Sequence, residues 1–101
     1  MARVLVDPAA NWEARLIDRG WRRFHPARPR TFAEEWNQAK RLLRRTPQIG
    51  EVCPRSHLPL LRRWLLEESQ HWLSYIIYDP SIDEVVVLLP WSTSRDEPPL
   101  D

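Results

Sequence analysis

The hydrophobic pattern of the first half of the chain is that of helices. From Pro8 to about Arg23 the apolar residues recur at helical spacing, at Ala9, Trp12, Leu16 and Ile17. Asp7 followed by Pro8 is well suited to cap and begin this helix, whereas Gly20 weakens its end. The apolar run Arg3–Val6 predicts a short first strand that leads into the helix.

A second helix follows the connection His25–Arg30, whose prolines lack an amide donor and cannot continue a helix. Thr31 and Glu34 fit a capping box at its start. One apolar stripe then runs along the helix through Phe32, Trp36, Ala39 and Leu43. Its last turns carry cations that interact favourably with the negative helix end, at Lys40, Arg41, Arg44 and Arg45. Pro47 and Gly50 close the element.

After residue 59 the pattern changes to that of strands joined by short turns. Strands are predicted over residues 60–66, 72–78 and 85–89, and turns at 67–70 and 79–83. The last strand is apolar on both faces, which indicates the centre of a sheet. Because side chains alternate along a strand, Arg62 and Arg63 are expected on opposite faces. The order of strand, two helices and three strands predicts one α+β domain over residues 1–101, with an irregular tail from Arg95.

Six tryptophans are many for a chain of this length, and most are expected in the core. Trp12 and Trp36 lie on the apolar stripes of the two helices, and Trp64 and Trp72 lie in predicted strands. The two that sit near element ends, Trp21 and Trp91, are the better candidates for exposure and for contact with a partner.

The net charge of +1 conceals a strong asymmetry along the chain. Residues 1–63 hold 14 Lys and Arg against 6 Asp and Glu, whereas residues 64–101 hold 1 against 8. All of the basic residues except Lys40 are arginine, whose planar donor fork suits phosphate and carboxylate partners. The abundance of Arg, Ala, Pro and Trp together is equally explained by codon bias in a GC-rich genome.

Length and composition exclude several classes of protein. One cysteine, Cys53, cannot form an internal disulfide, which agrees with a reducing compartment. The longest apolar run, Val85–Trp91, is far shorter than the roughly 20 residues of a membrane span, and no apolar signal region is evident, so a cytoplasmic protein is expected. With glycine only at 20 and 50 there is no phosphate-binding loop, so no nucleotide cofactor is expected. Cys53 and His57 do not make a metal site by themselves.

Several short motifs follow one another along nearly the whole chain. They are Phe32-x3-Trp36-x2-Ala39-x2-Leu42 with Pro47-x2-Gly50 after it, Leu61-Arg62-Arg63, Tyr75-Ile-Ile-Tyr78, Val85-Val-Val-Leu-Leu and Ser94-Arg95-Asp96. In this order and spacing the chain resembles the RelE/ParE superfamily of toxins from type II toxin-antitoxin modules. The resemblance implies a β-α-α-β-β-β fold in which an antiparallel sheet packs on a helical hairpin and the first strand lies beside the fourth. It also implies a cognate antitoxin, encoded beside the toxin, whose extended segment wraps and neutralises it.

RelE-like members of this superfamily cut messenger RNA on the ribosome with basic side chains on the sheet and often a tyrosine near the C-terminus. Such cleavage needs a group that takes the 2′-hydroxyl proton, a donor for the leaving oxygen and cations for the phosphate. The candidates here are Arg62, Arg63 and Arg95 for charge, and His71 or Tyr78 for proton transfer. Each also has a structural alternative, because the arginines can pair with acidic residues of the C-terminal half, Tyr78 can be a packing residue and His71 a solvated one.

ParE-like members instead inhibit DNA gyrase and need no nuclease residues. No lysine follows Lys40, no tyrosine follows Tyr78, and the C-terminal half is acidic, which opposes close approach to RNA. The sequence therefore favours a ParE-like toxin, with a ribosome-dependent messenger RNA endonuclease as the alternative. A degenerate member that acts only as a protein-interaction module is the third hypothesis. The expected partners are an antitoxin and either gyrase or the ribosome with its messenger RNA, with no membrane, metal or cofactor.

Overall fold

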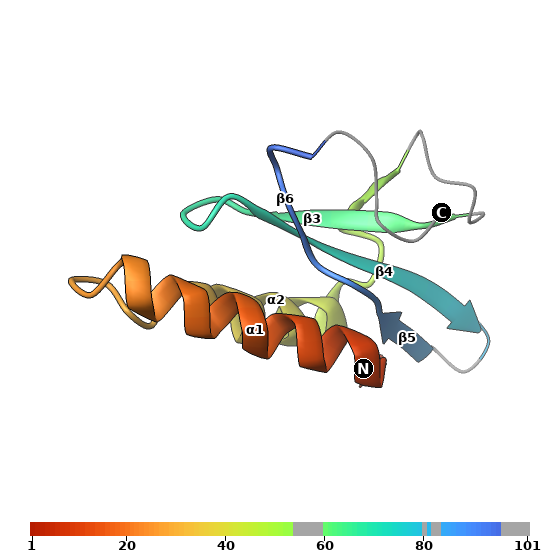
Figure 1. Cartoon of the computed structure of the whole chain (residues 1–101). Coiled ribbons are helices and arrows are strands. Elements are labelled where there is room, and N and C mark those ends of the chain that lie inside the picture. The colour runs from red at the N-terminus through yellow and green to blue at the C-terminus, as the bar shows by residue number, and fades with distance from the viewer. Residues whose placement is uncertain (54–59, 80, 82–83, 96–101) are drawn as a thin grey trace.

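The chain folds into two helices on one side of a mixed β-sheet, so its fold class is α+β (Figure 1). The computed structural model describes residues 1–53, 60–79, 81 and 84–95, and of Tyr78 and Asp79 only the backbone. The helices of this part of the chain are α1 (Pro8–Phe24) and α2 (Thr31–Arg45). Its strands are β1 (Arg3–Val6), β2 (Glu51–Val52), β3 (Arg62–Leu66), β4 (His71–Asp79), β5 (Glu84–Val87) and β6 (Trp91–Ser92).

The first helix begins as predicted, and the second begins differently. Asp7 caps α1, with its side-chain oxygen accepting a hydrogen bond from the N–H of Ala9 at 2.8 Å. In α2 the capping residue is Arg30 and no side chain caps the helix, so the predicted capping box of Thr31 and Glu34 is wrong. The N–H of Glu34 already bonds to the carbonyl of Arg30 at 2.9 Å, which places Thr31 inside the helix with only 8% of it exposed.

The strand order in the sheet is β1-β5-β4-β3-β2, and β6 pairs with β4. The first strand lies beside β5, as predicted, but the two run parallel, so the sheet is mixed and the expectation of an antiparallel sheet is wrong for this pair. Two helices and three strands separate β1 from β5 along the chain, and β5 then joins the sheet beside β1 in the same direction. The other strand pairs are antiparallel.

The last predicted strand, over residues 85–89, ends two residues earlier than predicted, and a further short strand follows it. β5 ends at Val87, and pairing with β4 resumes only at Trp91 in β6. Between them lies Pro90, which has no amide donor for the ladder. Ser74 of β4 holds this connection, because its carbonyl accepts from the N–H of Leu88 at 2.8 Å and its hydroxyl donates to the carbonyl of Leu89 at 2.7 Å. β5 lies inside the sheet, between β1 and β4, as its apolar sequence indicates.

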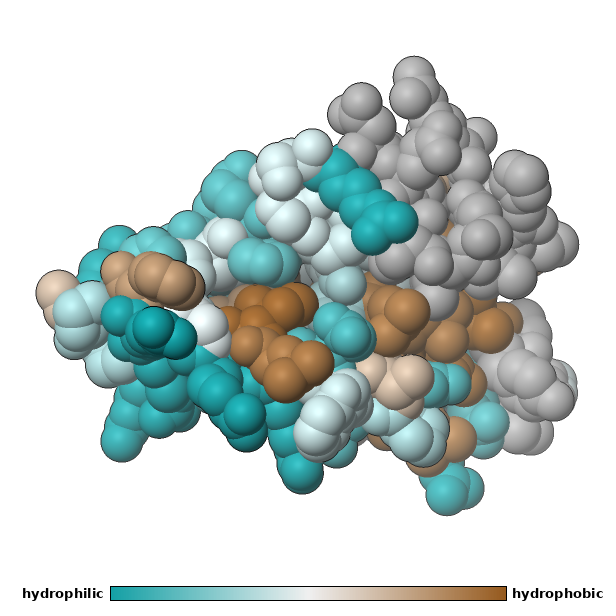
Figure 2. Space-filling view, viewed as in Figure 1, coloured by the Kyte–Doolittle hydropathy of each residue, from teal (hydrophilic) through white to brown (hydrophobic). Residues whose placement is uncertain are grey.

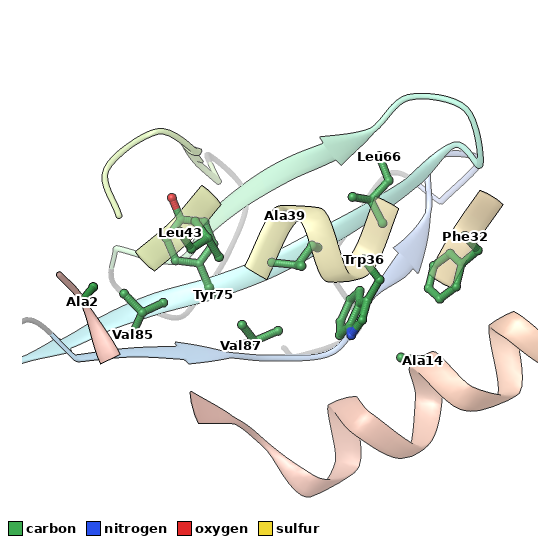
Figure 3. Packing of buried hydrophobic residues seen from close by; sticks show 11 residues of the cluster. Ala2, Ala14, Phe32, Trp36, Ala39, Leu43, Leu66, Tyr75, Val85 and Val87 are labelled. Atoms are coloured by element: carbon green, nitrogen blue, oxygen red, sulfur yellow. The ribbon is translucent and has the colours of Figure 1, made fainter. Parts of the chain in front are cut away.

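The core lies between the helices and the sheet (Figure 3). The stripe predicted for α2 is buried as expected, because Phe32, Trp36, Ala39 and Leu43 are each at most 4% exposed. The sheet contributes side chains that alternate onto its helix-facing side, at Leu66, Leu73, Tyr75, Val85 and Val87. At about 25 cal/mol per Å², burial of these side chains is the main stabilising contribution of the fold.

The tryptophans at the two ends of the chain behave opposite to expectation. Trp12 was expected in the core, but it is 59% exposed, whereas Trp91, expected near the surface, is 3% exposed. The buried side of α1 is instead formed by the small residues Ala10 and Ala14, with the partly buried Ile17 and Trp21. Two alanines one turn apart let α1 approach the core closely. With these alanines on the buried side of the helix, Trp12 lies on the side that faces solvent.

Candidate functional site

The two adjacent arginines of β3 lie on opposite faces of the sheet, as alternation requires. Arg62 is opposite Tyr75 of β4, which faces the helices, and Arg63 is opposite Ser74 on the other face. The face that carries Arg63 is called here the open face, because α1 and α2 cover the other one (Figure 1). A cationic site that uses both side chains together cannot form on either face.

Arg62 is held by the loop that follows α2. Its Nη1 donates hydrogen bonds to the carbonyl of Gly50 at 2.7 Å and to that of Gln48 at 3.2 Å. The N–H of Gly50 in turn donates to the hydroxyl of the fully buried Tyr75 at 2.8 Å. Burial raises the pKa of Tyr75, against the opposing effects of the Gly50 hydrogen bond and the Arg62 charge. These contacts join the loop to β3 and β4 and occupy the guanidinium with main-chain oxygens.

Close packing at this point requires glycine at position 50. A Cβ there would lie 2.6 Å from the Tyr75 hydroxyl oxygen and 2.8 Å from the Arg63 carbonyl oxygen, both shorter than real contacts. The backbone of Gly50 has no positive φ, so the requirement is for space and not for an unusual conformation. Sequence reasoning noted Gly50 as the end of the helical segment and missed its contact with Tyr75.

On the open face, Arg63 is held by an ion pair and by a cation–π contact. Its Nε donates to the carboxylate of Glu51 at 2.6 Å, and its guanidinium carbon lies 4.1 Å from the centre of the Trp72 ring. The pair with Glu51 and the cation–π contact hold the side chain 20% exposed, beside a groove of about 360 Å³ that Ile49, Leu65 and Trp72 help to line. Of the predicted arginines, this one combines a fixed position with access to solvent.

His71 faces the helices at the start of β4. Its Nδ1 donates to the carbonyl of Ser69 at 2.8 Å, which leaves Nε2 as the acceptor, and its ring packs edge-on against Phe32 at 5.3 Å. Burial lowers the pKa of His71, although the Ser69 carbonyl and the Glu35 charge act in the opposite direction. The imidazole is therefore neutral near pH 7 and available as a proton acceptor in chemical terms.

The predicted residues do not converge on one point. Arg62 and His71 lie at opposite ends of the β3–β4 ladder, four residues apart, which corresponds to about 13 Å between their backbones. Arg63 is on the other face, and the exposed Arg95 follows β6, whose Ser92 pairs with His71. The side chain of Tyr78 lies outside the described residues. Within the described ranges, no arrangement of these groups surrounds a single phosphate.

An acidic groove lies between α2 and the end of β3 with the turn that follows it. It has a volume of about 490 Å³, and its charged walls are Glu34, Glu35, Glu67 and Glu68. Two of the carboxylates already have structural roles: Glu35 accepts hydrogen bonds from the N–H groups of Glu68 and Ser69, and Glu68 pairs with Arg28 at 2.5 Å. The groove is thus partly a brace for the turn between β3 and β4. This use of Glu35 carried no signal in the sequence.

No metal centre is found in the described part of the chain, where no three His, Cys, Asp or Glu side chains gather. Cys53 is buried there with a free thiol, and His57 lies outside the described residues. Across the same ranges, neither helix is long and apolar enough to cross a membrane. In comparisons with known proteins, the chain matches no protein-family model, and no curated protein sequence matches it significantly.

Proposed function

We propose that this chain is the toxin of a type II toxin-antitoxin module, of the ParE-like kind, which arrests growth in the cytoplasm by inhibiting DNA gyrase. A cognate antitoxin would neutralise it. Two features support this family assignment: the motifs quoted from the sequence, and the strand order β1-β5-β4-β3, in which β1 lies beside β5. The resemblance also implies a helical hairpin packed on the sheet, although it implies an antiparallel sheet and β1 here runs parallel to β5.

The observation that carries the choice of gyrase over RNA is the dispersal of the basic groups. Cleavage at a phosphodiester needs a proton acceptor, a donor and cations within hydrogen-bonding reach of one group. Arg62 is occupied by the carbonyls of Gln48 and Gly50. The neutral His71 is four residues along the ladder from it, and Arg63 is on the opposite face. A toxin that acts by binding a protein needs no such convergence.

The test is to induce the chain alone in bacteria and to follow messenger RNA and chromosome integrity during the first minutes of growth arrest. The proposal expects intact RNA, DNA breaks and filamentous cells. Codon-positioned cleavage of RNA would instead assign the ribosome-dependent nuclease activity. Unimpaired growth with full-length, folded protein would favour the non-toxic interaction module.

A paired substitution sharpens this test. Arg63→Ala removes a cation of the open face, and Arg41→Ala removes an exposed cation of α2 as the matched control. If the open face contacts the target, Arg63→Ala reduces toxicity and Arg41→Ala does not. Equal toxicity of both variants would exclude Arg63 from the contact.

A further inference from the structure

An apolar ridge runs along α1, from its outward side at Trp12 to the groove beside the turn at 68–71, which Gly20 and Phe24 help to line. It consists of Trp12, Leu16, Gly20 and Phe24, which are spaced four residues apart and so form one row on the helix surface. The side chains of Trp12, Leu16 and Phe24 are 59%, 39% and 74% exposed. In Figure 2 an apolar area lies over the middle of α1, with hydrophilic residues beneath it. We call this row the outer ridge.

The outer ridge has a gap at Gly20, and a groove begins there. A Cβ at Gly20 would meet no atom within 4 Å, so the space above it is open. The groove has a volume of about 510 Å³, with walls formed by Ile17, Trp21 and Phe24 of α1 and by the turn at 68–71. Small residues at a helix surface let a second helix approach closely, and ridges of one helix pack into grooves of the other.

A row of arginines lies beside the outer ridge. Arg15, Arg19 and Arg23 are exposed and four residues apart, parallel to the apolar row. Within the described ranges none of the three forms an ion pair, whereas the neighbouring Arg22 pairs with Asp18 at 3.0 Å. Arg23 lies 5.6 Å from the centre of the Phe24 ring, so charge and apolar surface are contiguous.

The arginine row distinguishes between two possible binding partners of the outer ridge, a second copy of this chain and a different protein with acidic side chains. In a two-fold symmetric pair the same patch meets itself, so a second copy would bring both arginine rows into one interface, where like charges repel. A partner with carboxylates beside its apolar residues would instead satisfy both features. Complementary charge of this kind speeds association and selects the partner.

We propose that the outer ridge of α1 binds an acidic amphipathic helix of a partner protein. An apolar side chain of that helix enters the groove above Gly20, and its carboxylates lie along Arg15, Arg19 and Arg23. The helix of an antitoxin is one such partner, and only that identification rests on the proposed function. Binding at this surface involves neither Arg62 nor Arg63.

The experiment uses the purified full chain and two labelled synthetic peptides of about 20 residues, long enough for a helix. Both carry leucines four residues apart, and the flanking positions are Glu in one peptide and Lys in the other. Fluorescence anisotropy measures each dissociation constant at low and at moderate salt. We expect the acidic peptide to bind at least about tenfold more tightly than the basic one, with a difference that shrinks as salt rises.

Gly20→Leu is the decisive variant, because it fills the groove while favouring the helix. It is expected to weaken binding of the acidic peptide by about tenfold or more. Gln38→Leu adds the same side chain to an exposed position of α2 and is expected to leave binding unchanged. Replacing Arg15 and Arg19 by Glu should reverse the preference between the peptides.

Three results would overturn the proposal: equal binding of the two peptides, binding of neither, or binding that Gly20→Leu leaves intact. Sedimentation that shows a dimer of the unmodified chain, lost in Gly20→Leu, would also overturn it by making a second copy the occupant. These measurements do not involve growth arrest. Their failure therefore leaves the toxin proposal standing, and a non-toxic chain leaves this one standing.

Discussion

Replacement of Gly50 by alanine tests the close packing between the loop after α2 and the buried Tyr75. The added Cβ would lie 2.6 Å from the Tyr75 hydroxyl oxygen and 2.8 Å from the Arg63 carbonyl, so backbone as well as side chain must shift. Overpacking of this kind costs about 1–3 kcal/mol. Alanine also reduces the entropy of the unfolded chain, which stabilises by roughly 0.4–1 kcal/mol. The steric term is larger, so Gly50→Ala is expected to lower the free energy of unfolding.

Tyr75→Phe probes the same contact from the other side. It leaves the buried N–H of Gly50 without its acceptor, at a cost of about 1–3 kcal/mol. In the double variant the nearest obstacle to the new Cβ is absent, although the Arg63 carbonyl and a ring carbon of residue 75 remain at 2.8 Å. The two changes should therefore be less than additive, by about 0.5–1 kcal/mol.

Urea unfolding followed by tryptophan fluorescence gives the four free energies of this cycle. Gln48→Ala, at an exposed position in the same loop whose side chain is not used by Arg62, is the control and should change stability little. Additive effects of Gly50→Ala and Tyr75→Phe would refute the contact. So would a Gly50→Ala protein as stable as the unmodified chain.

Three further predictions concern the burial and the contacts of single side chains. Burial lowers the pKa of His71, so below about pH 6.5 the unfolded chain binds more protons at this residue than the folded chain does, and stability should decline as the pH falls. In His71→Gln, the difference in urea midpoint between pH 7.5 and pH 5.5 should therefore shrink. An unchanged difference would contradict this. Trp36→Ala should cost about 3–5 kcal/mol and Trp12→Ala no more than about 0.5 kcal/mol, so comparable losses in calorimetry would contradict the orientation of α1. Arg62→Ala should destabilise by about 1–3 kcal/mol, because the part-buried carbonyl of Gly50 loses its partner. Arg95→Ala should be neutral in the same denaturation assay, and the reverse order would show that Arg62 has no structural role.

Long periodic segments were readable from the sequence because their pattern repeats over several turns. α1 and α2 begin within one residue of their predicted starts, and the stripe through Phe32, Trp36 and Leu43 is buried as predicted. Short elements gave no such pattern. β2 and β6, of two residues each, form only because β3 and β4 offer them a ladder to pair with.

For the candidate site, alternation along β3 was enough to place Arg62 and Arg63 on opposite faces. Which face each one occupies follows from register, since a shift of one residue exchanges the faces. The pairing of Arg62 with Tyr75 turns Arg62 toward the helices and the carbonyls of Gln48 and Gly50. The role of Arg62 as a structural contact therefore could not be inferred from residues near it in the chain.

The family resemblance implied the neighbouring position of the first strand and the strand at residue 85. The residue pattern by itself determined the α+β class and the two helices, with the start of the first. These follow from local periodicity, capping and the order of elements. Tertiary structure alone decided the parallel direction of that strand pair, the rotation that buries Ala10 and Ala14 and exposes Trp12, and the separation of Arg62 from His71. Each of these depends on contacts between segments far apart in the chain, where side-chain volume and register outweigh any local preference.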